Sequence, residues 1–410
     1  MTGPIAPPSH LTPAGGRPPG LTRVNRTEYE MAYSGVQTFL KWPMCMTPED
    51  LRTGGVDVAV GGVPWDGTTT GRTGTHLGPY GIRHGDYITD ASRLSHLDVR
   101  VDPLEHLVLC DYGDADVLIG DPEATYAAVR TFVAEILDGG AMPIILGGDR
   151  TITWPSATAV ADAYGHGRLG ILQFGAHPVS APGRHGAWDG PGSPIHRLIE
   201  SGAVPGRNVV QFGLRGYTPQ PAALDWLEEQ QVRSHFMAEI RRDGFDTVLD
   251  RAIDEALDSA DHLYLSVDIG AADPAFAPGT GTPEPGGLTA DEMMTAMRRV
   301  AAEAGIVAMD VLEVSPPYDP GVGRTAQLAR RCVLEALVGT AMRKVGLTER
   351  RYMDPRATGT QAPRTFRTGA VNSVHADVHA AVDAAVHAAV DAVVDAVSPS
   401  GAVNSVARGR

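Results

Sequence analysis

The stretch that decides the fold runs from Leu263 to Thr289 and reads LYLSVDIGAADPAFAPGTGTPEPGGLT. It begins with the mainly apolar run Leu263–Val267, which is typical of a strand buried on both faces of a sheet. Asp268 follows this run directly, and a loop rich in Gly and Pro leads to Thr289, where a helix is predicted to begin. A strand, a loop and a helix in this order form one unit of a layered α/β fold.

The same alternation of apolar runs and helical stretches extends along most of the chain. Further buried strands are predicted at Val56–Val60, Leu107–Cys110, Met142–Leu146, Leu169–Phe174, Val209–Phe212 and Ile306–Leu312. Helices are predicted at Glu123–Leu137, Pro155–Tyr164, Ser193–Ser201, Pro221–Gln230, Phe245–Ala260, Thr289–Ala304 and Thr325–Val345. This alternation predicts an α/β fold, a doubly wound and mainly parallel sheet with helices on both faces. Ligands bind at the carboxyl ends of the strands in such sheets, so the residues after each run are candidates for a site.

Polar and glycine-rich segments follow several of these runs. The loop Gly61–Gly74 has neither the G-x-G-x-x-G nor the Walker spacing, which argues against nucleotide binding. The acidic cluster Asp111–Asp116 is compatible with a metal site, a helix cap or a structural salt link. The other runs are followed by Gly147-Gly148-Asp149-Arg150, by Gly175-Ala176-His177 and by Glu313-Val314-Ser315-Pro316.

Three segments resemble the ureohydrolase family of arginases and agmatinases. Asp273–Thr289 is similar to the family signature, Gly147-Gly148-Asp149 lies where the family has an earlier motif, and Tyr33–Leu40 resembles the agmatinase branch. The resemblance covers about Arg23 to Lys344. It implies the arginase-like fold, a homo-oligomer that is a trimer or a hexamer, and a pair of manganese ions at the strand ends.

The sequence departs from this family at most of the metal-binding positions. The family takes its ligands from a His after Gly-Gly-Asp, from an Asp-Ala-His-x-Asp motif and from an Asp-x-Asp motif. The matching residues here are Arg150, then Gly175, His177 and Val179, then Asp268 and Gly270. A hard divalent ion prefers about six oxygen or imidazole ligands, and only His177 and Asp268 remain. Arg150 also places a permanent positive charge where the cation would bind. We therefore expect no metal cofactor, and manganese only if these positions are wrongly matched.

The remaining residues define a candidate catalytic site without metal. The hydrolysis that the family implies uses a metal-bound hydroxide, so the ordinary reaction is not expected here. Arg150, His177 and Asp268 are the candidate catalytic residues. Arg150 would stabilise a developing oxyanion, and His177 would act as general acid or base.

Three further residues are candidates for binding the substrate. Glu313 matches the carboxylate with which the family holds a guanidinium group, and a carboxylate can form a bidentate pair with that group. His185 and Asp189 lie in a loop where the family has a His and this sequence has Pro191. The expected partner is therefore a small molecule that carries a guanidino or amino group.

Three hypotheses about function follow. The first is a repurposed, metal-independent enzyme that acts on a guanidino- or amino-bearing small molecule in a biosynthetic pathway. The second is a pseudoenzyme or regulatory subunit, which an internal Arg150–Asp268 ion pair would support. The third is a conventional manganese-dependent agmatinase or guanidino hydrolase, with Asp111, Asp114, Asp116 or Asp149 as replacement ligands.

Composition excludes several other classes of function. The 410 residues carry a formal net charge of −15, and no basic block that could track nucleic acid is present. No stretch approaches the length of a membrane span. Cys45, Cys110 and Cys332 are far apart and suggest neither a disulfide framework nor a zinc site, which favours a reducing, cytoplasmic setting.

The ends of the chain differ from the middle. Residues 1–28 are predicted to be a flexible arm rich in Pro and Gly, and residues 29–347 a ureohydrolase-like domain. Residues 348–373 are predicted to be a linker, 374–397 an amphipathic helix rich in Ala and Val, and 398–410 a tail. His375 and His379 could form a metal site, but a solvated or self-associating face is the preferred interpretation.

Overall fold

The computed structural model describes residues 17–25, 34–69, 71–84, 93–178, 194–217, 222–321 and 323–359. His185, Asp189, the predicted helix 374–397 and the tail 398–410 lie outside these ranges. The chain divides into two compact units, Met1–Met353 and Asp354–Arg410, and the sheet belongs to the first. The predicted domain boundaries stay a prediction.

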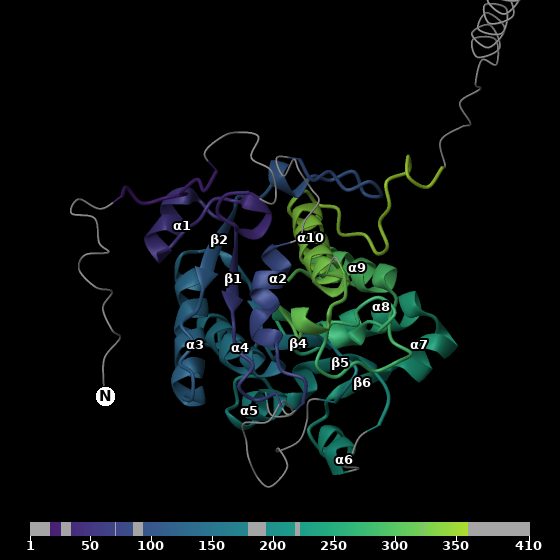
Figure 1. The fold of residues 1–410 in the computed structure, drawn as a ribbon. Helices are drawn as coiled ribbons and strands as arrows, with labels where there is room; N and C mark the ends of the chain where they lie inside the picture. The colour runs from purple at the N-terminus through teal and green to yellow at the C-terminus, as the bar shows by residue number, and fades with distance from the viewer. Residues whose placement is uncertain are drawn as a thin grey trace, which may run out of the picture. The chain divides into compact units, whose positions relative to one another are not determined.

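A parallel sheet forms the centre of the first unit (Figure 1). The strands follow the order β2-β1-β3-β8-β7-β4-β5-β6, and every pairing between described strands is parallel. Their bounds are β1 Val58–Val63, β2 Leu109–Asp114, β3 Met142–Gly147, β4 Leu169–Phe174, β5 Val209–Leu214, β6 Arg233–Phe236, β7 His262–Asp268 and β8 Ala308–Leu312. Parallel neighbours need crossover connections, which the helices provide.

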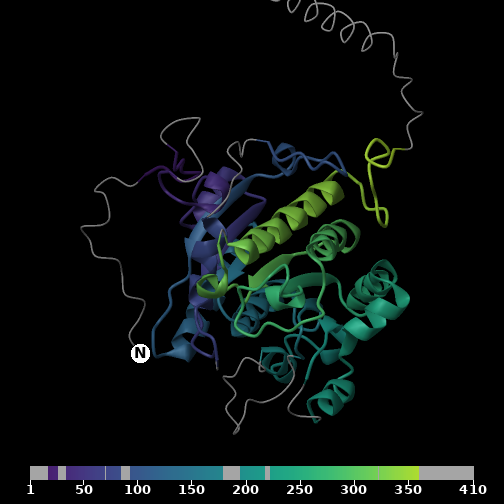
Figure 2. The ribbon, with the colours of Figure 1, turned by 45° about the vertical axis from the view of Figure 1, so that its right-hand side comes forward.

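Helices cover both faces of the sheet, as the turned view in Figure 2 also shows. Their bounds are α1 Pro48–Gly54, α2 Gly78–Arg83, α3 Pro122–Asp138, α4 Thr153–Tyr164, α5 Pro194–Glu200, α6 Ala222–Glu229, α7 Met237–Asp243, α8 Phe245–Leu257, α9 Ala290–Arg299 and α10 Arg324–Lys344. Ile144 and Leu146 of β3 belong to the core cluster that includes α8, α9 and α10, whereas Ile145 belongs to the cluster with α3 and α4. Alternate side chains of a strand point to opposite faces, so both faces are buried and the strands read as continuous apolar runs.

The predicted fold class is confirmed, but the sequence pattern does not predict the short helices α1 and α2, the strand β6 or the helix α7. β6 reads Arg-Ser-His-Phe and lies at the edge of the sheet, so it has no continuous apolar run. α7 follows it directly and has only seven residues. Short edge elements carry little hydrophobic signal because only part of their surface is buried.

Residues before α1 cover the other edge of the sheet, next to β2. Met44 pairs with Asp111 of β2 as a parallel bridge, and Thr22 pairs with Met44 as an antiparallel bridge. Asp50 in α1 accepts a hydrogen bond from the Gly20 N–H and forms an ion pair with Arg17. Part of the predicted arm therefore contacts the folded unit.

Candidate active site

Four neighbouring strands bring the predicted site residues together. The four strands are β3, β8, β7 and β4, which are neighbours in this order. Arg150 follows the end of β3, Glu313 follows β8, Asp268 is the last residue of β7, and His177 follows β4. We call these four residues the strand-end site. The carboxyl ends of parallel strands lie at one edge of a sheet, and all four residues lie there, while their predicted roles stay predictions.

Arg150 lies between two carboxylates in the strand-end site. Its Nη2 is 3.1 Å from Oδ2 of Asp268, and its Nε is 3.4 Å from Oε1 of Glu313. The Arg150 backbone N–H donates to the same Glu313 oxygen at 3.0 Å. The side chains of Arg150, Asp268 and Glu313 are 8%, 4% and 6% exposed, respectively. An internal cation thus neutralises the centre of the site.

Backbone geometry also fixes these groups. Glu313 has a φ of 64°, in the left-handed region that non-glycine residues rarely adopt, and its N–H donates to the Gly148 carbonyl. Asp149, next to Arg150, accepts hydrogen bonds from the backbone and hydroxyl groups of Thr68 and Thr151. A strained backbone conformation persists only where several surrounding contacts fix it. The hydrogen bonds of Glu313 and Asp149 therefore hold the site in one arrangement.

Burial and charge set the protonation states. Burial alone would lower the pKa of Arg150, but Asp268 and Glu313 outweigh it and raise that pKa, so the guanidinium stays charged. Burial raises the pKa of Glu313 to about 7, because it outweighs the opposing effect of Arg150, and Asp268 adds to the rise. Burial also raises the pKa of Asp149. The site therefore holds one permanent cation, together with carboxyl groups whose ionisation is made unfavourable by burial.

His177 lies at the rim of the site with Glu284. Its Nε2 is 3.8 Å from Oε2 of Glu284, and its side chain is 26% exposed. Burial, followed by the charge of Arg150, lowers the pKa of His177. The imidazole is therefore neutral at pH 7 and can accept a proton.

Arg215 holds the loop that carries Glu284. Arg215 follows β5 directly in the sequence. Its guanidinium donates hydrogen bonds to the backbone carbonyls of Gly213, Gly270, Ala271, Ala272, Glu284 and Pro285. Sequence reasoning missed Arg215, Glu284 and Thr68. Arg215 comes three residues after the predicted strand Val209–Phe212 and directly after β5, so the rule that located Arg150 would have found it.

The described donors do not fit a metal site. Asp268 is occupied, because it accepts from the Gly270 N–H at 2.8 Å and pairs with Arg150. A Cβ added at Gly175 or Gly270 would meet Asp268 atoms at 3.8 and 3.0 Å, so both positions face the site but supply no ligand. Among the residues that the structure describes, no three His, Cys, Asp or Glu side chains could hold an ion together.

The suggested replacement ligands have other partners. Arg83 binds Asp111 through its Nε at 2.7 Å and Asp114 through its Nη1 at 2.5 Å. Asp149 is bonded by two threonines. Asp116 is exposed. Asp111, Asp114 and Asp116 therefore do not converge on the strand-end site, and Asp149, next to Arg150, is held by the threonines. The remaining candidates His185 and Asp189 lie outside the described residues.

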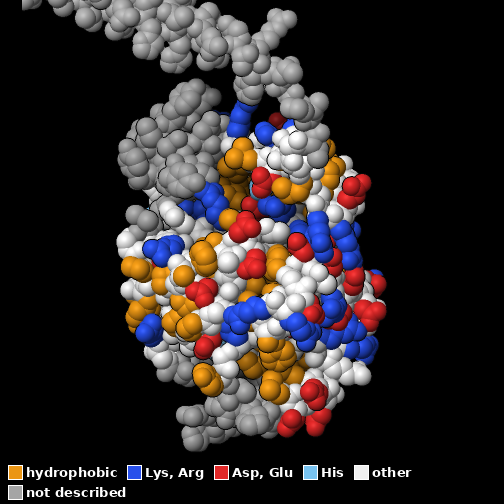
Figure 3. Space-filling model, turned by 90° about the vertical axis from the view of Figure 1, so that its right-hand side faces the viewer, with side chains coloured by type: hydrophobic (Ala, Val, Ile, Leu, Met, Phe, Trp, Pro, Cys, Tyr) orange, Lys and Arg blue, Asp and Glu red, His pale blue; other side chains and the backbone are white. Residues whose placement is uncertain are grey.

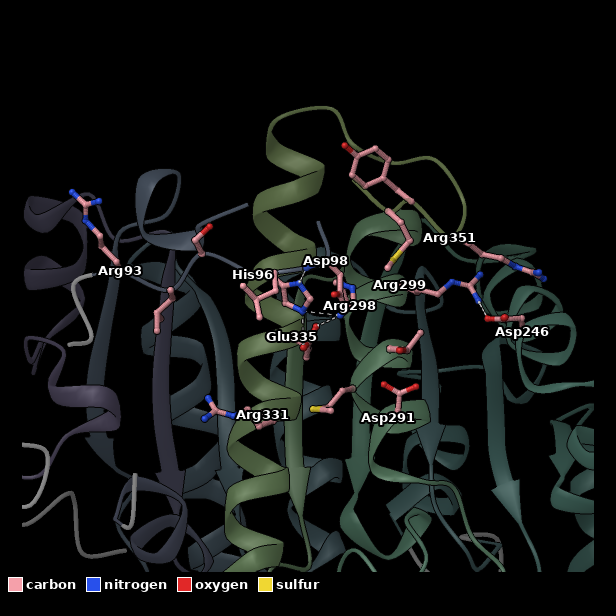
Figure 4. A pocket seen from close by; sticks show the side chains of 17 residues that line it. Arg93, His96, Asp98, Asp246, Asp291, Arg298, Arg299, Arg331, Glu335 and Arg351 are labelled. Carbon is pink, nitrogen blue, oxygen red and sulfur yellow. Dashed lines mark hydrogen bonds and ion pairs between the residues drawn. The ribbon is translucent and has the colours of Figure 1, made fainter. Parts of the chain in front are cut away.

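A second feature is a cavity of about 860 Å³ between the segment 93–98, α9, α10 and residues 351–353. Arg150, His177, Asp268 and Glu313 do not line it. Figure 4 shows His96, Arg298 and Glu335 pointing toward one another in its wall, with Nε2 of His96 3.0 Å from Oε1 of Glu335. We call it the α9–α10 cavity.

The charge of the surface and the length of the helices concern two kinds of partner, nucleic acid and membranes. Figure 3 shows Lys and Arg side chains intermixed with Asp and Glu on the face it presents, where the described residues form no broad basic patch. None of the helices in the described part of the chain is long and apolar enough to cross a membrane.

Comparison with known proteins gives a consistent result. The model of the arginase family matches residues 56–339. Guanidinopropionase from Pseudomonas aeruginosa is 33% identical over 309 residues, which are 74% of this chain and 92% of that protein. Proclavaminate amidinohydrolase from Streptomyces clavuligerus is 33% identical over 308 residues, and its solved structure superposes with a TM-score of 0.68, covering 77% of this chain and 100% of that one. Arginase from Bacillus subtilis superposes with a TM-score of 0.58 at 25% identity, covering 68% of this chain and 98% of that one.

Proposed function

This chain belongs to the arginase family, and from that premise we propose that it is a non-hydrolytic member, a ligand-binding or regulatory protein whose strand-end site is closed by Arg150. The ion triad Asp268–Arg150–Glu313 is the observation that carries this proposal. An internal Arg150–Asp268 pair is the feature expected of a pseudoenzyme.

Arg150 removes two functions at once. Its guanidinium lies at a metal-ligand position of the family, where it binds the Asp268 carboxylate that a metal would need. Its Nε and backbone N–H also contact Oε1 of Glu313. Glu313 matches the carboxylate with which the family binds the guanidinium group of a substrate. Because Arg150 is permanently charged, loss of its proton cannot release either carboxylate near neutral pH.

The ligand expected under this proposal is a small cation at the rim of the site. Glu284 is 24% exposed and His177 is 26% exposed, so both are reachable from solvent while the triad is not. An amino or guanidino group would pair with Glu284. A trimer or hexamer and a cytoplasmic location stay predictions.

Metal analysis and urea release test the proposal. The protein is incubated with excess manganese, desalted and analysed for bound metal, and urea is measured with agmatine, 3-guanidinopropionate and 4-guanidinobutyrate, compounds that the names of its relatives suggest. We expect no stoichiometric manganese and no urea. About two ions per chain with chelator-sensitive urea release would overturn the proposal.

A restored variant is the matched control. Arg150→His, Gly175→Asp, Val179→Asp and Gly270→Asp together return the family's metal-binding residues. We expect this variant to bind manganese where the natural sequence does not. Equal metal content in both would show that these positions do not decide metal binding.

A second candidate function, metal-independent catalysis, is favoured by His177. Its neutral imidazole is partly exposed and faces Glu284, which suits a general base. The test is product formation by mass spectrometry from the same three compounds in the presence of chelator. Turnover that Arg150→Ala or His177→Ala abolishes would favour this candidate over the non-hydrolytic one.

A further inference from the structure

Two of the three cysteines come together at the edge of the sheet, although they are far apart in the sequence. Asp111 of β2 donates its N–H to the Pro43 carbonyl at 2.9 Å and accepts from the Cys45 N–H at 3.0 Å. This places Cys45 beside the strand that contains Cys110. Both side chains are fully buried in the same core cluster, and their thiols form a hydrogen bond.

The two thiols are not equivalent. The hydrogen bond from Cys110 is the largest influence on Cys45 and lowers the pKa of Cys45, whereas the same bond and burial raise the pKa of Cys110. Cys110 therefore donates and Cys45 accepts, so Cys45 is the thiol that ionises first. The thiolate is the nucleophile in redox chemistry, and a neighbouring thiol can resolve its oxidised form.

Cys332 provides the contrast inside the same protein. It is fully buried in α10, and burial raises its pKa. Its side chain belongs to the core cluster on the other face of the sheet. Cys332 thus shares the burial of the other two cysteines but lacks their thiol partner among the described residues.

We propose that Cys45 and Cys110 are a peroxide-oxidisable dithiol that closes to an intrachain disulfide. In the first step the Cys45 thiolate attacks one oxygen of hydrogen peroxide, the S–O bond forms, the O–O bond breaks, and the leaving hydroxide takes a proton to become water. In the second step Cys110 attacks the Cys45 sulfur, the S–S bond forms, the S–O bond breaks, and a second water leaves with the Cys110 proton. Peroxide is reduced and the two thiols are oxidised.

Peroxide reaches the buried pair through local opening of the edge. Residues 43–45, which we call the edge segment, attach to β2 through backbone hydrogen bonds of a single bridge. Such short edge contacts open more readily than central strands. Closing the disulfide would join the edge segment covalently to β2 and prevent that opening.

Thiol counting on the full chain tests this proposal. The protein is treated with hydrogen peroxide, freed of excess peroxide, alkylated under denaturing conditions and analysed by non-reducing peptide mass mapping. We expect the number of free thiols to fall from three to one, with Cys332 alone alkylated and a Cys45–Cys110 linked peptide that dithiothreitol releases. Three remaining thiols at a peroxide dose that oxidises free glutathione, or a disulfide that includes Cys332, would overturn the proposal.

Variants separate the two roles. Cys332→Ser should form the same linked peptide, whereas Cys45→Ser should leave Cys110 as a free thiol after peroxide. Cys110→Ala should stop at the sulfenic acid of Cys45, which dimedone traps. If Cys110→Ala destabilises the core too far, the same trapping in the natural sequence at early times is the substitute, and absence of any Cys45 adduct there would contradict the order of steps.

Discussion

Arginine side chains meet buried carboxylates in two regions of this protein, with different results. In the strand-end site, Arg150 fills the space between Asp268 and Glu313, and all three are at least nine-tenths buried. In the α9–α10 cavity, Arg298 pairs with Glu335 in the wall and leaves about 860 Å³ open. The same ion pair can therefore close a site or line one, and the difference depends on whether the cation lies between the carboxylates or beside them.

The largest expected effect comes from removing the closing cation. Arg150→Met should destabilise the protein by about 3–5 kcal/mol, because it leaves two buried carboxylates without their counter-charge. The measurement is urea unfolding, with Arg150→Lys as the control that keeps the charge. Equal stability of Arg150→Met and the natural protein would mean that the triad does not close the site.

The pH profile of Glu313 gives the next effect. Its pKa in the folded state is raised from 4.5 to about 7, so the folded protein binds a proton that the unfolded chain releases at lower pH. This stabilisation is fully present below pH 4.5 and is lost as the pH rises toward 7. The stability difference between the natural protein and Glu313→Gln should therefore change by up to about 3 kcal/mol over that range. A flat difference between the two unfolding curves would contradict this protonation.

A smaller effect is expected in the cavity wall. Arg298→Met should cost about 2 kcal/mol, since the Glu335 carboxylate keeps its contact with His96 and can be solvated by water in the cavity. Because both ion pairs are buried, the comparison with Arg150→Met under identical urea unfolding isolates the effect of the open cavity beside Arg298. If Arg298→Met is the more damaging change, the cavity is not the more open of the two regions.

The smallest effect is rescue by a free cation. Methylguanidinium should enter the space left in Arg150→Gly and pair with Asp268 and Glu313. At ten times its Kd it would stabilise this variant by about 1.4 kcal/mol, seen as a rise in Tm. Arg298→Ala is the matched control, and an equal rise there would show that the effect is not specific to the strand-end site.

The sequence predicts the central part of this arrangement well. Long apolar runs fix the strands, and reading the residue after each run brings Arg150, His177, Asp268 and Glu313 to one edge of the sheet. The sequence anticipates the pair between Arg150 and Asp268 only as a condition of the pseudoenzyme hypothesis, because β8 lies between the strands that precede or contain these residues. These predictions succeed because a buried parallel strand has a strong hydrophobic signal and a defined end.

Other features depend on contacts that no local pattern encodes. Thr68 binds Asp149 from the loop after β1, and Glu284 lies beside His177 in a loop whose carbonyls accept hydrogen bonds from Arg215. The contact between Cys45 and Cys110 depends on how the edge segment returns to β2. Each is a tertiary contact between polar or small residues, for which periodicity gives no signal.

The covered edge of the sheet has a consequence for assembly. A strand with free backbone groups at an edge is a template for another chain, but here the edge segment pairs with β2, and Thr22 pairs with Met44 of that segment. At the opposite edge, β6 has only four residues and begins with Arg233, whose guanidinium is bound to α8 and Asp258. Copies of this protein should therefore associate through their helices and loops, and the sheet should end within each chain.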